Sequence, residues 1–266
     1  MKDFLHSLTV MGLFFLLSCA HKGTGGPSKS NQDHLIGGTV WFQTSAEYKA
    51  LSYQAYNTAK DQLNLKLKTA KKGKLLAVVL DSDETILDNG AYQATNILEN
   101  RTFSNDNWKN WVDKAEASAI PGALDFLQFA ASKNVEIFIV TNRKDIELEA
   151  TYKNFQKLKY PIKKENILIK GKSSGKEDRR VLVSQKYEIA LLIGDNASDF
   201  SSLFDKKSVA DRAAASDALK EEFGRRMIVL PNPMYGDWES ALYNYDFSGS
   251  DEQRSQIRKG ALKAIK

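Results

Sequence analysis

The stretch that most constrains this chain is residues 75–89, LLAVVLDSDETILDN. Six apolar residues, Leu75 to Leu80, run directly into Asp81, which is typical of a strand buried on both faces of a parallel sheet. Such sheets bind ligands beyond the carboxyl ends of their strands, where Asp81 and Asp83 lie. If the strand end stays extended, both carboxylates point to one side, and they repel each other unless a cation separates them or one is protonated. The stretch therefore predicts either a metal site or an acid–base pair.

The scarcity of histidine and cysteine excludes several kinds of catalysis. The single cysteine is Cys19 and the last histidine is His34, so we expect the folded body to contain neither residue type. A His-ligated zinc hydrolase, a Ser-His-Asp triad and a thiolate nucleophile are then excluded. Carboxylates, lysines, hydroxyls and hard cations remain for catalysis. The net charge of +5 is mild and gives no sign of a protein that binds nucleic-acid polymers.

The N-terminal residues predict an export signal and a linker. Residues 1–19 are interpreted as a lipoprotein signal peptide, because Leu16-Leu17-Ser18-Cys19 matches a bacterial lipobox and the apolar run before it is too short to span a bilayer. Cys19 is then the lipid-modified first residue, with an ordinary secretory signal as the alternative. Residues 20–36 are rich in Gly, Ser, Lys and Pro and predict a flexible tether. Ala20, rather than Asp, after the cysteine favours the outer membrane of a bacterial cell envelope.

The rest of the chain, residues 37–266, alternates apolar runs with helical patterns. Strands are predicted at 75–80, 135–140, 166–170, 189–193 and 227–230, and helices at 45–69, 122–132, 145–158, 177–186, 199–223 and 251–266. This alternation predicts an α/β fold with a mostly parallel sheet and helices on both faces. Thr44-x-x-Glu47 predicts a capping box for the first helix. The basic C-terminal helix is expected to pack on the surface through Ile257, Ala261 and Ile265, with membrane binding as the alternative.

The chain between Asp81 and Thr141 is about twice as long as the roughly 30 residues that a βαβ unit needs. The excess follows the carboxyl end of the first strand directly. We therefore predict a small, mainly helical cap near residues 90–118.

The residues after the first strand carry a family resemblance. D-x-D-E-T-x-L-D-N at 81–89 resembles the first motif of the haloacid dehalogenase (HAD) phosphatases, and most closely that of the class C, lipoprotein-type bacterial acid phosphatases. WFQTSAEYKALSYQAYNTA, from Trp41, is similar to the N-terminal signature of that class, which implies a further cap element near residues 40–72. Thr141-Asn142, a lysine and GDNASD at 194–199 match the later motifs in order. The lysine is Lys176, because SSGKEDRR resembles the family's SSKEPRR with one extra glycine, and Lys172 is the alternative.

The resemblance implies a HAD-like Rossmannoid sheet and a Mg²⁺-dependent acid phosphatase that forms an aspartyl-phosphate. An acid two residues after the nucleophile fits an oxygen leaving group, which needs a proton, better than a halide. The resemblance implies that Asp81 is the nucleophile and that Asp83 is the general acid and base. It implies Mg²⁺ ligands from Asp81, the Asp83 backbone carbonyl and Asp195. Thr141, Asn142 and Lys176 would bind the phosphate, and Asp199 would support the lysine or a metal-bound water.

Two aromatic residues bear on the substrate. Trp108 and Tyr235 match positions that lie near the leaving group in this family, and rings suit the stacking of a base or aryl group. Nucleoside 5′-monophosphates, hence 5′-nucleotidase activity, and aryl phosphates are expected, with ordinary half-buried packing of both rings as the alternative. The expected partners are small phosphomonoesters and, through the lipid, a membrane, while a homodimer stays open. The rival functions are a HAD phosphotransferase and a catalytically silent surface-binding lipoprotein.

Overall fold

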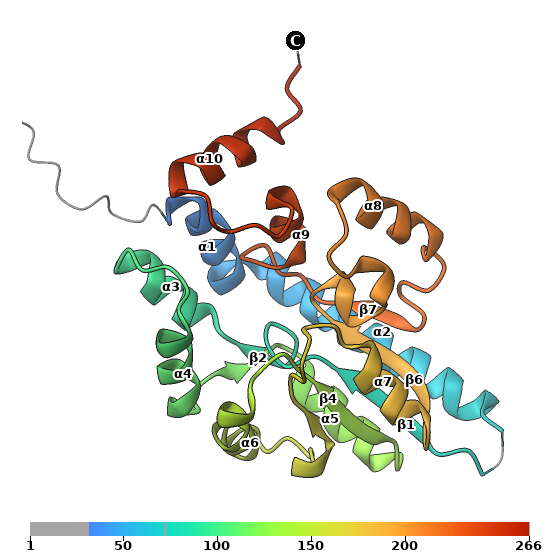
Figure 1. Ribbon diagram of the computed structural model, residues 1–266. Helices are drawn as coiled ribbons and strands as arrows, with labels where there is room; N and C mark the ends of the chain where they lie inside the picture. The colour runs from blue at the N-terminus through green and yellow to red at the C-terminus, as the bar shows by residue number, and fades with distance from the viewer. Residues whose placement is uncertain (1–31, 72, 266) are drawn as a thin grey trace, which may run out of the picture.

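The computed structural model describes residues 32–71 and 73–265 (Figure 1). Its main sheet has five strands, all parallel, in the order β5-β4-β1-β6-β7. Their bounds are β1 (Leu76–Leu80), β4 (Glu136–Val140), β5 (Ile167–Leu168), β6 (Glu188–Gly194) and β7 (Met227–Val229). The predicted α/β fold with a parallel sheet is confirmed, and the five strands lie where the apolar runs placed them to within one or two residues at either end.

The described residues also form a series of helices. They are α1 (Ile36–Thr44), α2 (Ala46–Thr69), α3 (Gly90–Leu98), α4 (Asn105–Lys114), α5 (Ala123–Ser132), α6 (Leu148–Lys157), α7 (Glu177–Ser184), α8 (Val209–Ala218), α9 (Asp237–Ser240) and α10 (Asp251–Gly260). The short 3₁₀ turns are η1 (Asp33–Leu35), η2 (Asp145–Glu147), η3 (Lys164–Asn166), η4 (Ala197–Asp199), η5 (Ser202–Phe204) and η6 (Ala241–Tyr243).

The central strand β1 is buried on both faces. Val78 and Leu80 belong to the core shared with α2 and α5, whereas Ala77 and Val79 belong to the core shared with α7. All five β1 residues are buried, and each large one contributes roughly 1.5–3 kcal/mol through burial. Because both faces of the strand are buried, its sequence is a continuous apolar run rather than an alternation of apolar and polar residues.

The order of the strands reverses beside β1. From β1 the chain proceeds to β4 and β5 on one side of the sheet and then returns to β6 and β7 on the other. Ligands of open α/β sheets bind where the strand order reverses in this way, beyond the carboxyl ends. Asp81 follows β1 and Asp195 follows β6, and the Asp81 N–H donates to the Ile193 oxygen at 3.0 Å.

The excess chain after Asp81 forms a two-helix insertion. Strands β2 (Leu87–Asp88) and β3 (Ser118–Ala119) pair antiparallel and close its base, and α3 and α4 lie between them. In Figure 1 the insertion projects at the left of the molecule, with α4 near α6. The residues predicted as a cap, 90–118, correspond to this insertion.

The N-terminal part differs from the prediction in two ways. Within the described residues the first helical turn begins at Asp33, so the last residues of the predicted tether belong to η1 and α1. The prediction of a capping box at Thr44 is wrong, because Thr44 is the last residue of α1 and its hydroxyl donates to the Val40 backbone oxygen at 2.7 Å. Ser45 caps α2 instead, accepting the Tyr48 N–H at 3.0 Å. The predicted signal peptide, Cys19 and residues 20–31 of the tether lie outside the described residues.

One histidine does belong to the folded body, contrary to expectation. His34 lies in η1, and its Nε2 is 3.6 Å from a carboxylate oxygen of Glu239. It makes no contact with the aspartates that follow β1 and β6. The exclusion of histidine chemistry at that edge therefore still holds for the described part of the chain.

The C-terminal third also differs from its prediction. Residues 199–223 do not form one helix, because the Ser201 and Ser208 side chains accept backbone N–H groups and start η5 and α8 separately. Helix α10 ends at Gly260 and buries none of its residues; Ile257 is 43% exposed and Ile265 is fully exposed. The expected apolar packing of this helix is therefore wrong. Within the described chain, no helix is both long and apolar enough to cross a bilayer.

Candidate active site

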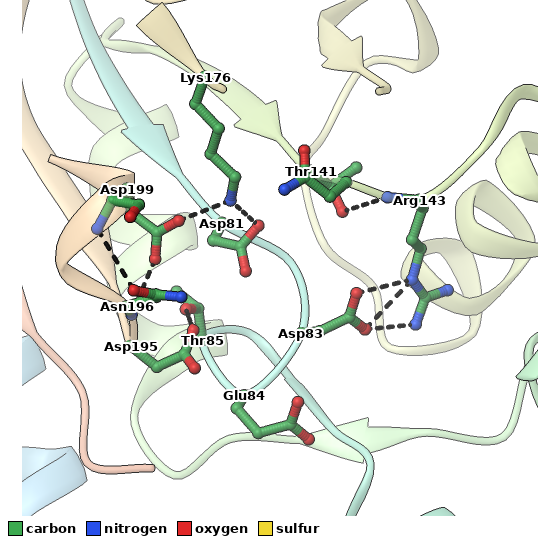
Figure 2. A network of polar contacts seen from close by, with 12 residues as sticks. Asp81, Asp83, Glu84, Thr85, Thr141, Arg143, Lys176, Asp195, Asn196 and Asp199 are labelled. Carbon is green, nitrogen blue, oxygen red and sulfur yellow. Dashed lines mark hydrogen bonds and ion pairs between the residues drawn. The ribbon is translucent and has the colours of Figure 1, made fainter. Parts of the chain in front are cut away.

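Asp81 and Asp199 share one buried lysine. The Lys176 Nζ donates to Asp81 Oδ1 and lies 2.7 Å from Asp199 Oδ1 (Figure 2). The side chain of Asp81 is 12% exposed, that of Asp199 is 6% exposed and that of Lys176 is 7% exposed. Lys176 immediately precedes α7, whereas Lys172 lies in the preceding loop and is exposed. The geometry thus favours Lys176 over Lys172 as the lysine of the site.

Asp195 is held beside this trio from two directions. Its Oδ1 accepts the Thr85 hydroxyl at 3.2 Å and its Oδ2 accepts an Asn232 amide N–H at 2.8 Å. Gly194, just before it, makes room for Asp199, because a Cβ on Gly194 would lie 2.2 Å from Asp199 Oδ2. A side chain at position 194 would therefore displace Asp199 from the site.

Three carboxylates could hold a cation together. Oxygens of Asp81, Asp195 and Asp199 all lie within 4.8 Å of one another. Hard oxygen ligands at this spacing are what Mg²⁺ prefers, so the residues present fit the expected ion. Asp199 joins Asp81 and Asp195 in this cluster, whereas the sequence suggested only a supporting role for it. The Asp83 side chain lies outside the cluster, and its expected contribution was the backbone carbonyl alone.

The crowding of these carboxylates changes their proton affinity. Burial raises the pKa of Asp81 to about 7; Lys176 opposes the rise, and the charges of Asp199 and Asp83 add to it. Burial, with Asp199 and Asp81, raises the pKa of Asp195 well above its usual value. For Lys176, burial alone would lower the pKa, but Asp199 and Asp81 raise it above its ordinary range. A divalent cation bound between Asp81, Asp195 and Asp199 would reduce the repulsion between their carboxylates, which contributes to these raised pKa values.

A pH-dependent stability follows from the raised pKa of Asp81. Between pH about 4 and about 7 the folded state holds a proton on Asp81 that the unfolded state has lost. With EDTA, the free energy of unfolding should therefore fall as pH rises through this window, by up to about 1.4 kcal/mol per pH unit for this group. Mg²⁺ binds the deprotonated carboxylates, so the rise in Tm that Mg²⁺ causes should grow from pH 4 to pH 7.

Thermal unfolding with EDTA and with Mg²⁺ across these pH values tests this. In the Asp81→Asn variant the fall in Tm with pH under EDTA should be shallower, because one of the titrating carboxyls is gone. A Mg²⁺-induced rise in Tm that shrinks with increasing pH would contradict the assignment of these carboxylates to a cation site.

The Asp83 carboxylate points to a different partner. β1 ends at Leu80 and the chain bends at Ser82, between the two aspartates, so the extended strand end assumed from the sequence is wrong. Asp83 Oδ1 accepts from Arg143 Nη2 at 2.7 Å, and both Asp83 oxygens lie 3.2 Å from Arg143 Nε. Arg143 Nη1 donates in turn to the Thr151 hydroxyl at 2.9 Å. Figure 2 shows Asp83 turned toward Arg143 and away from Lys176.

Thr141 and Asn142 follow β4, as predicted, at the same edge of the sheet. Thr141 is buried and its Oγ1 accepts the Arg143 N–H at 3.2 Å. The Asn142 side chain is exposed, and its Oδ1 accepts from Arg179 Nη2 at 2.8 Å. Arg179 also donates to the Thr141 backbone oxygen and fixes this loop. Thr141 therefore lies beside the aspartates, whereas the Asn142 side chain faces outward.

The two aromatic candidates have different contacts. Trp108, half-buried on α4, packs edge-on against Tyr92 with ring centroids 5.1 Å apart and lies 5.4 Å from the Arg143 guanidinium. The Tyr235 hydroxyl donates to Glu84 Oε2. Glu84 is fully buried, and burial together with the charges of Asp83 and Asp195 raises its pKa well above its usual value.

Comparisons with known proteins agree with this geometry. Residues 30–238 match the family described as HAD superfamily, subfamily IIIB (Acid phosphatase). Because this match spans most of the sequence, the chain belongs to that family of HAD acid phosphatases. The class C resemblance is confirmed by solved structures. The chain is 44% identical to the class C acid phosphatase from Bacillus anthracis, with a TM-score of 0.86 over 89% of this chain and 100% of that one.

Two further relatives extend the comparison. A crystal structure of the Bacillus anthracis class C acid phosphatase with tungstate bound gives a TM-score of 0.84 at 44% identity, over 88% of this chain and 99% of that chain. Acid phosphatase 1 of Solanum lycopersicum is 24% identical over 164 residues, 59% of this chain. The match spans 57% of the tomato protein's length.

Sequence reasoning missed Arg143, Asn89 and the partners of Glu84. A signal for Arg143 was present, since a cation two residues after Thr141 follows the same strand end as the predicted phosphate-binding pair. Asn89 closes the quoted D-x-D-E-T-x-L-D-N motif without any role assigned to it. One of its partners, Trp111, comes from α4, and nothing local in the sequence predicts how that helix lies against the strand ends.

Proposed function

We propose that this protein hydrolyses phosphomonoesters through a phosphate carried on Asp81. The observation that supports it best is the ion pair between the Asp81 carboxylate and the buried Lys176, at the point where the strand order reverses. The chain that carries this pair belongs to the HAD acid phosphatase family. Carboxylates are suitable nucleophiles for phosphorus when positive groups offset the charge of the phosphate. In the described chain, no other carboxylate in the site contacts Lys176 except Asp199.

The proposed reaction has two steps. An Asp81 oxygen bonds to phosphorus as the bond to the substrate oxygen breaks, and Asp83 gives its proton to that departing oxygen. Asp83 then takes a proton from the water that attacks the phosphorus, which releases inorganic phosphate and restores the Asp81 carboxylate. Lys176, the Thr141 hydroxyl and the Asn142 backbone N–H would hold the phosphoryl oxygens. One structure of the Bacillus anthracis relative has tungstate, an oxyanion, bound to it, and this supports an oxyanion site in the present chain.

Mg²⁺ is the proposed cofactor. Asp81, Asp195 and the backbone carbonyl of Asp83 would hold it, with Asp199 within reach of the same cluster. When bound, the ion supplies positive charge that offsets the repulsion between these carboxylates and an anionic substrate.

Nucleoside 5′-monophosphates and aryl phosphates are the proposed substrates. Trp108 offers a half-buried ring beside Arg143, and Tyr235 is fixed by its hydroxyl on Glu84. Rigid aromatic rings can stack on a base or aryl group, and each stacked base contributes about 1–3 kcal/mol. We therefore expect a higher kcat/KM for AMP than for glycerol phosphate, which has no ring.

Phosphate release tests the proposal. Protein lacking residues 1–19 is assayed with AMP and p-nitrophenyl phosphate from acid to neutral pH, with Mg²⁺ and with EDTA. We expect turnover that EDTA abolishes and Mg²⁺ restores. Phosphorylated alcohol or nucleoside in place of free phosphate would favour the phosphotransferase alternative. Folded, Mg²⁺-loaded protein that releases no phosphate from any substrate would favour the silent surface-binding lipoprotein.

We also propose that Cys19 carries a lipid anchor in the bacterial envelope, in the outer membrane. The support is the lipobox sequence alone, since Cys19 lies outside the described residues. Incorporation of a labelled fatty acid that persists in a Cys19→Ala variant would contradict it.

A further inference from the structure

Asn89 joins the insertion to the Asp83 carboxylate. Asn89 is fully buried between the end of β2 and the start of α3. Its Nδ2–H donates to Asp83 Oδ1 at 2.9 Å, and its Oδ1 accepts the Trp111 indole N–H at 2.7 Å. Its backbone N–H donates to Glu84 Oε1 at 2.9 Å. The side-chain oxygen and nitrogen of Asn89 are therefore both hydrogen-bonded.

Trp111 fixes which way the Asn89 amide faces. An indole N–H can only donate, so the Asn89 atom facing Trp111 must be the oxygen. The amide nitrogen then faces Asp83 and donates to it. Without the indole N–H the amide could rotate and present its oxygen to the carboxylate, where two acceptors would repel each other. The hydrogen bond from Trp111 thus holds the amide in the orientation in which Asn89 donates to Asp83, in addition to the donors from Arg143.

Helix α4 carries a second residue that is linked indirectly to the same carboxylate. Trp108 and Trp111 are three positions apart on α4, so they share one face of the helix. Trp108 lies over the Arg143 guanidinium, which in turn pairs with Asp83. Both tryptophans of this face therefore act on Asp83 through one intermediate side chain each.

The donors are distributed unequally over the two Asp83 oxygens. Oδ1 accepts from Arg143 Nη2, from Arg143 Nε and from Asn89 Nδ2. Oδ2 accepts only from Arg143 Nε, at 3.2 Å, within the described residues. The side chain of Asp83 is 18% exposed, against 2% for Arg143. Oδ2 is therefore the oxygen with lone pairs left to carry a proton to a leaving group.

We propose that Asn89 and Trp111 are positioning residues for Asp83, so that helix α4 of the insertion sets the orientation of the proton donor. This inference rests on the proposed function, in which Asp83 protonates the leaving oxygen. Donors on Oδ1 turn Oδ2 outward, and a proton transfer depends on hydrogen-bond reach to the departing atom. Loss of the orientation should therefore slow only those substrates whose leaving group needs the proton.

The test is the dependence on leaving group in a Trp111→Phe variant of the full chain, with Mg²⁺. Phe keeps an aromatic ring at this core-packed position but lacks the indole N–H. We expect kcat/KM for AMP to fall about 10- to 100-fold, a part of what general acid catalysis contributes. For p-nitrophenyl phosphate, whose phenolate leaves without a proton, we expect a change within about threefold. kcat/KM is the right quantity, because it reports the first phosphoryl transfer even when hydrolysis of the intermediate limits kcat.

Matched variants separate positioning from folding. Asn89→Ala should show the same selective loss, and the double variant should lose no more than either single one, because both remove one connection. Trp238→Phe, at a half-exposed tryptophan on α9, should leave both substrates unchanged. An equal loss for AMP and p-nitrophenyl phosphate, or no loss in folded Trp111→Phe and Asn89→Ala proteins, would overturn the inference. Wild-type protein that turns over neither substrate would instead contradict the proposed function.

Discussion

Replacing Asp81 with Asn is expected to abolish turnover while the fold stays intact. The amide cannot attack phosphorus, and loss of a nucleophile lowers kcat by a factor on the order of 10⁴ or more. The fold should persist because Asn keeps the shape of the side chain and removes one of three crowded carboxylates, while Lys176 keeps its 2.7 Å contact with Asp199. Steady-state kinetics on AMP and p-nitrophenyl phosphate, with Tm as the check on folding, measure both effects.

Asp61 on α2 provides the matched control. It is exposed and remote from the carboxyl ends of the strands, so Asp61→Asn should keep wild-type activity. Near-normal turnover by Asp81→Asn, in protein free of wild-type contamination, would rule out Asp81 as the nucleophile.

Replacing Lys176 with Met should harm both activity and stability. Activity should fall about 10²- to 10³-fold or more, since a charged group that holds phosphoryl oxygens is lost. Removing one partner of a buried ion pair costs about 3–5 kcal/mol, because the remaining charge is left buried and uncompensated. Here Asp81 and Asp199 would both lose their cation. Mg²⁺ should recover part of the lost Tm, since a bound cation would compensate the same carboxylates.

Lys172→Met is the control for this variant. Lys172 is exposed in the loop before α7, so its replacement should change neither activity nor Tm. If Lys172→Met lost activity and Lys176→Met did not, the two lysines would have been assigned the wrong way round.

The sequence was sufficient for the sheet and for the aspartates at its edge. Leu75 to Leu80 predicted β1 because burial on both faces leaves no polar residue in the strand. Asp81, Asp195 and Lys176 could be placed together because each lies next to an element of a parallel sheet, and the carboxyl ends of parallel strands meet at one edge. That inference needs only the order of the strands and the direction of each one.

The contacts that orient Asp83 could not be predicted in the same way. Arg143 follows a different strand, and Asn89 and Trp111 meet only because α4 folds back from the insertion. Their pairing depends on the tertiary position of a helix that no periodicity specifies. The predicted N-cap of α2 was wrong for a local reason. Thr44 and Ser45 are both good N-cap residues, and the additional helix α1 ends at Thr44, which leaves Ser45 as the N-cap of α2.

The covalent intermediate is the most direct test of the account. The Asp83→Asn variant is mixed with p-nitrophenyl phosphate and Mg²⁺, quenched in acid and analysed by peptide mass spectrometry. This leaving group departs without a proton, whereas the hydrolysis step lacks its base, so the intermediate should accumulate. We predict one phosphoryl group on the peptide that contains Asp81, and none in the Asp81→Asn/Asp83→Asn double variant. A burst of p-nitrophenol with no phosphoryl group on Asp81, or with phosphate on another residue, would contradict Asp81 as the nucleophile.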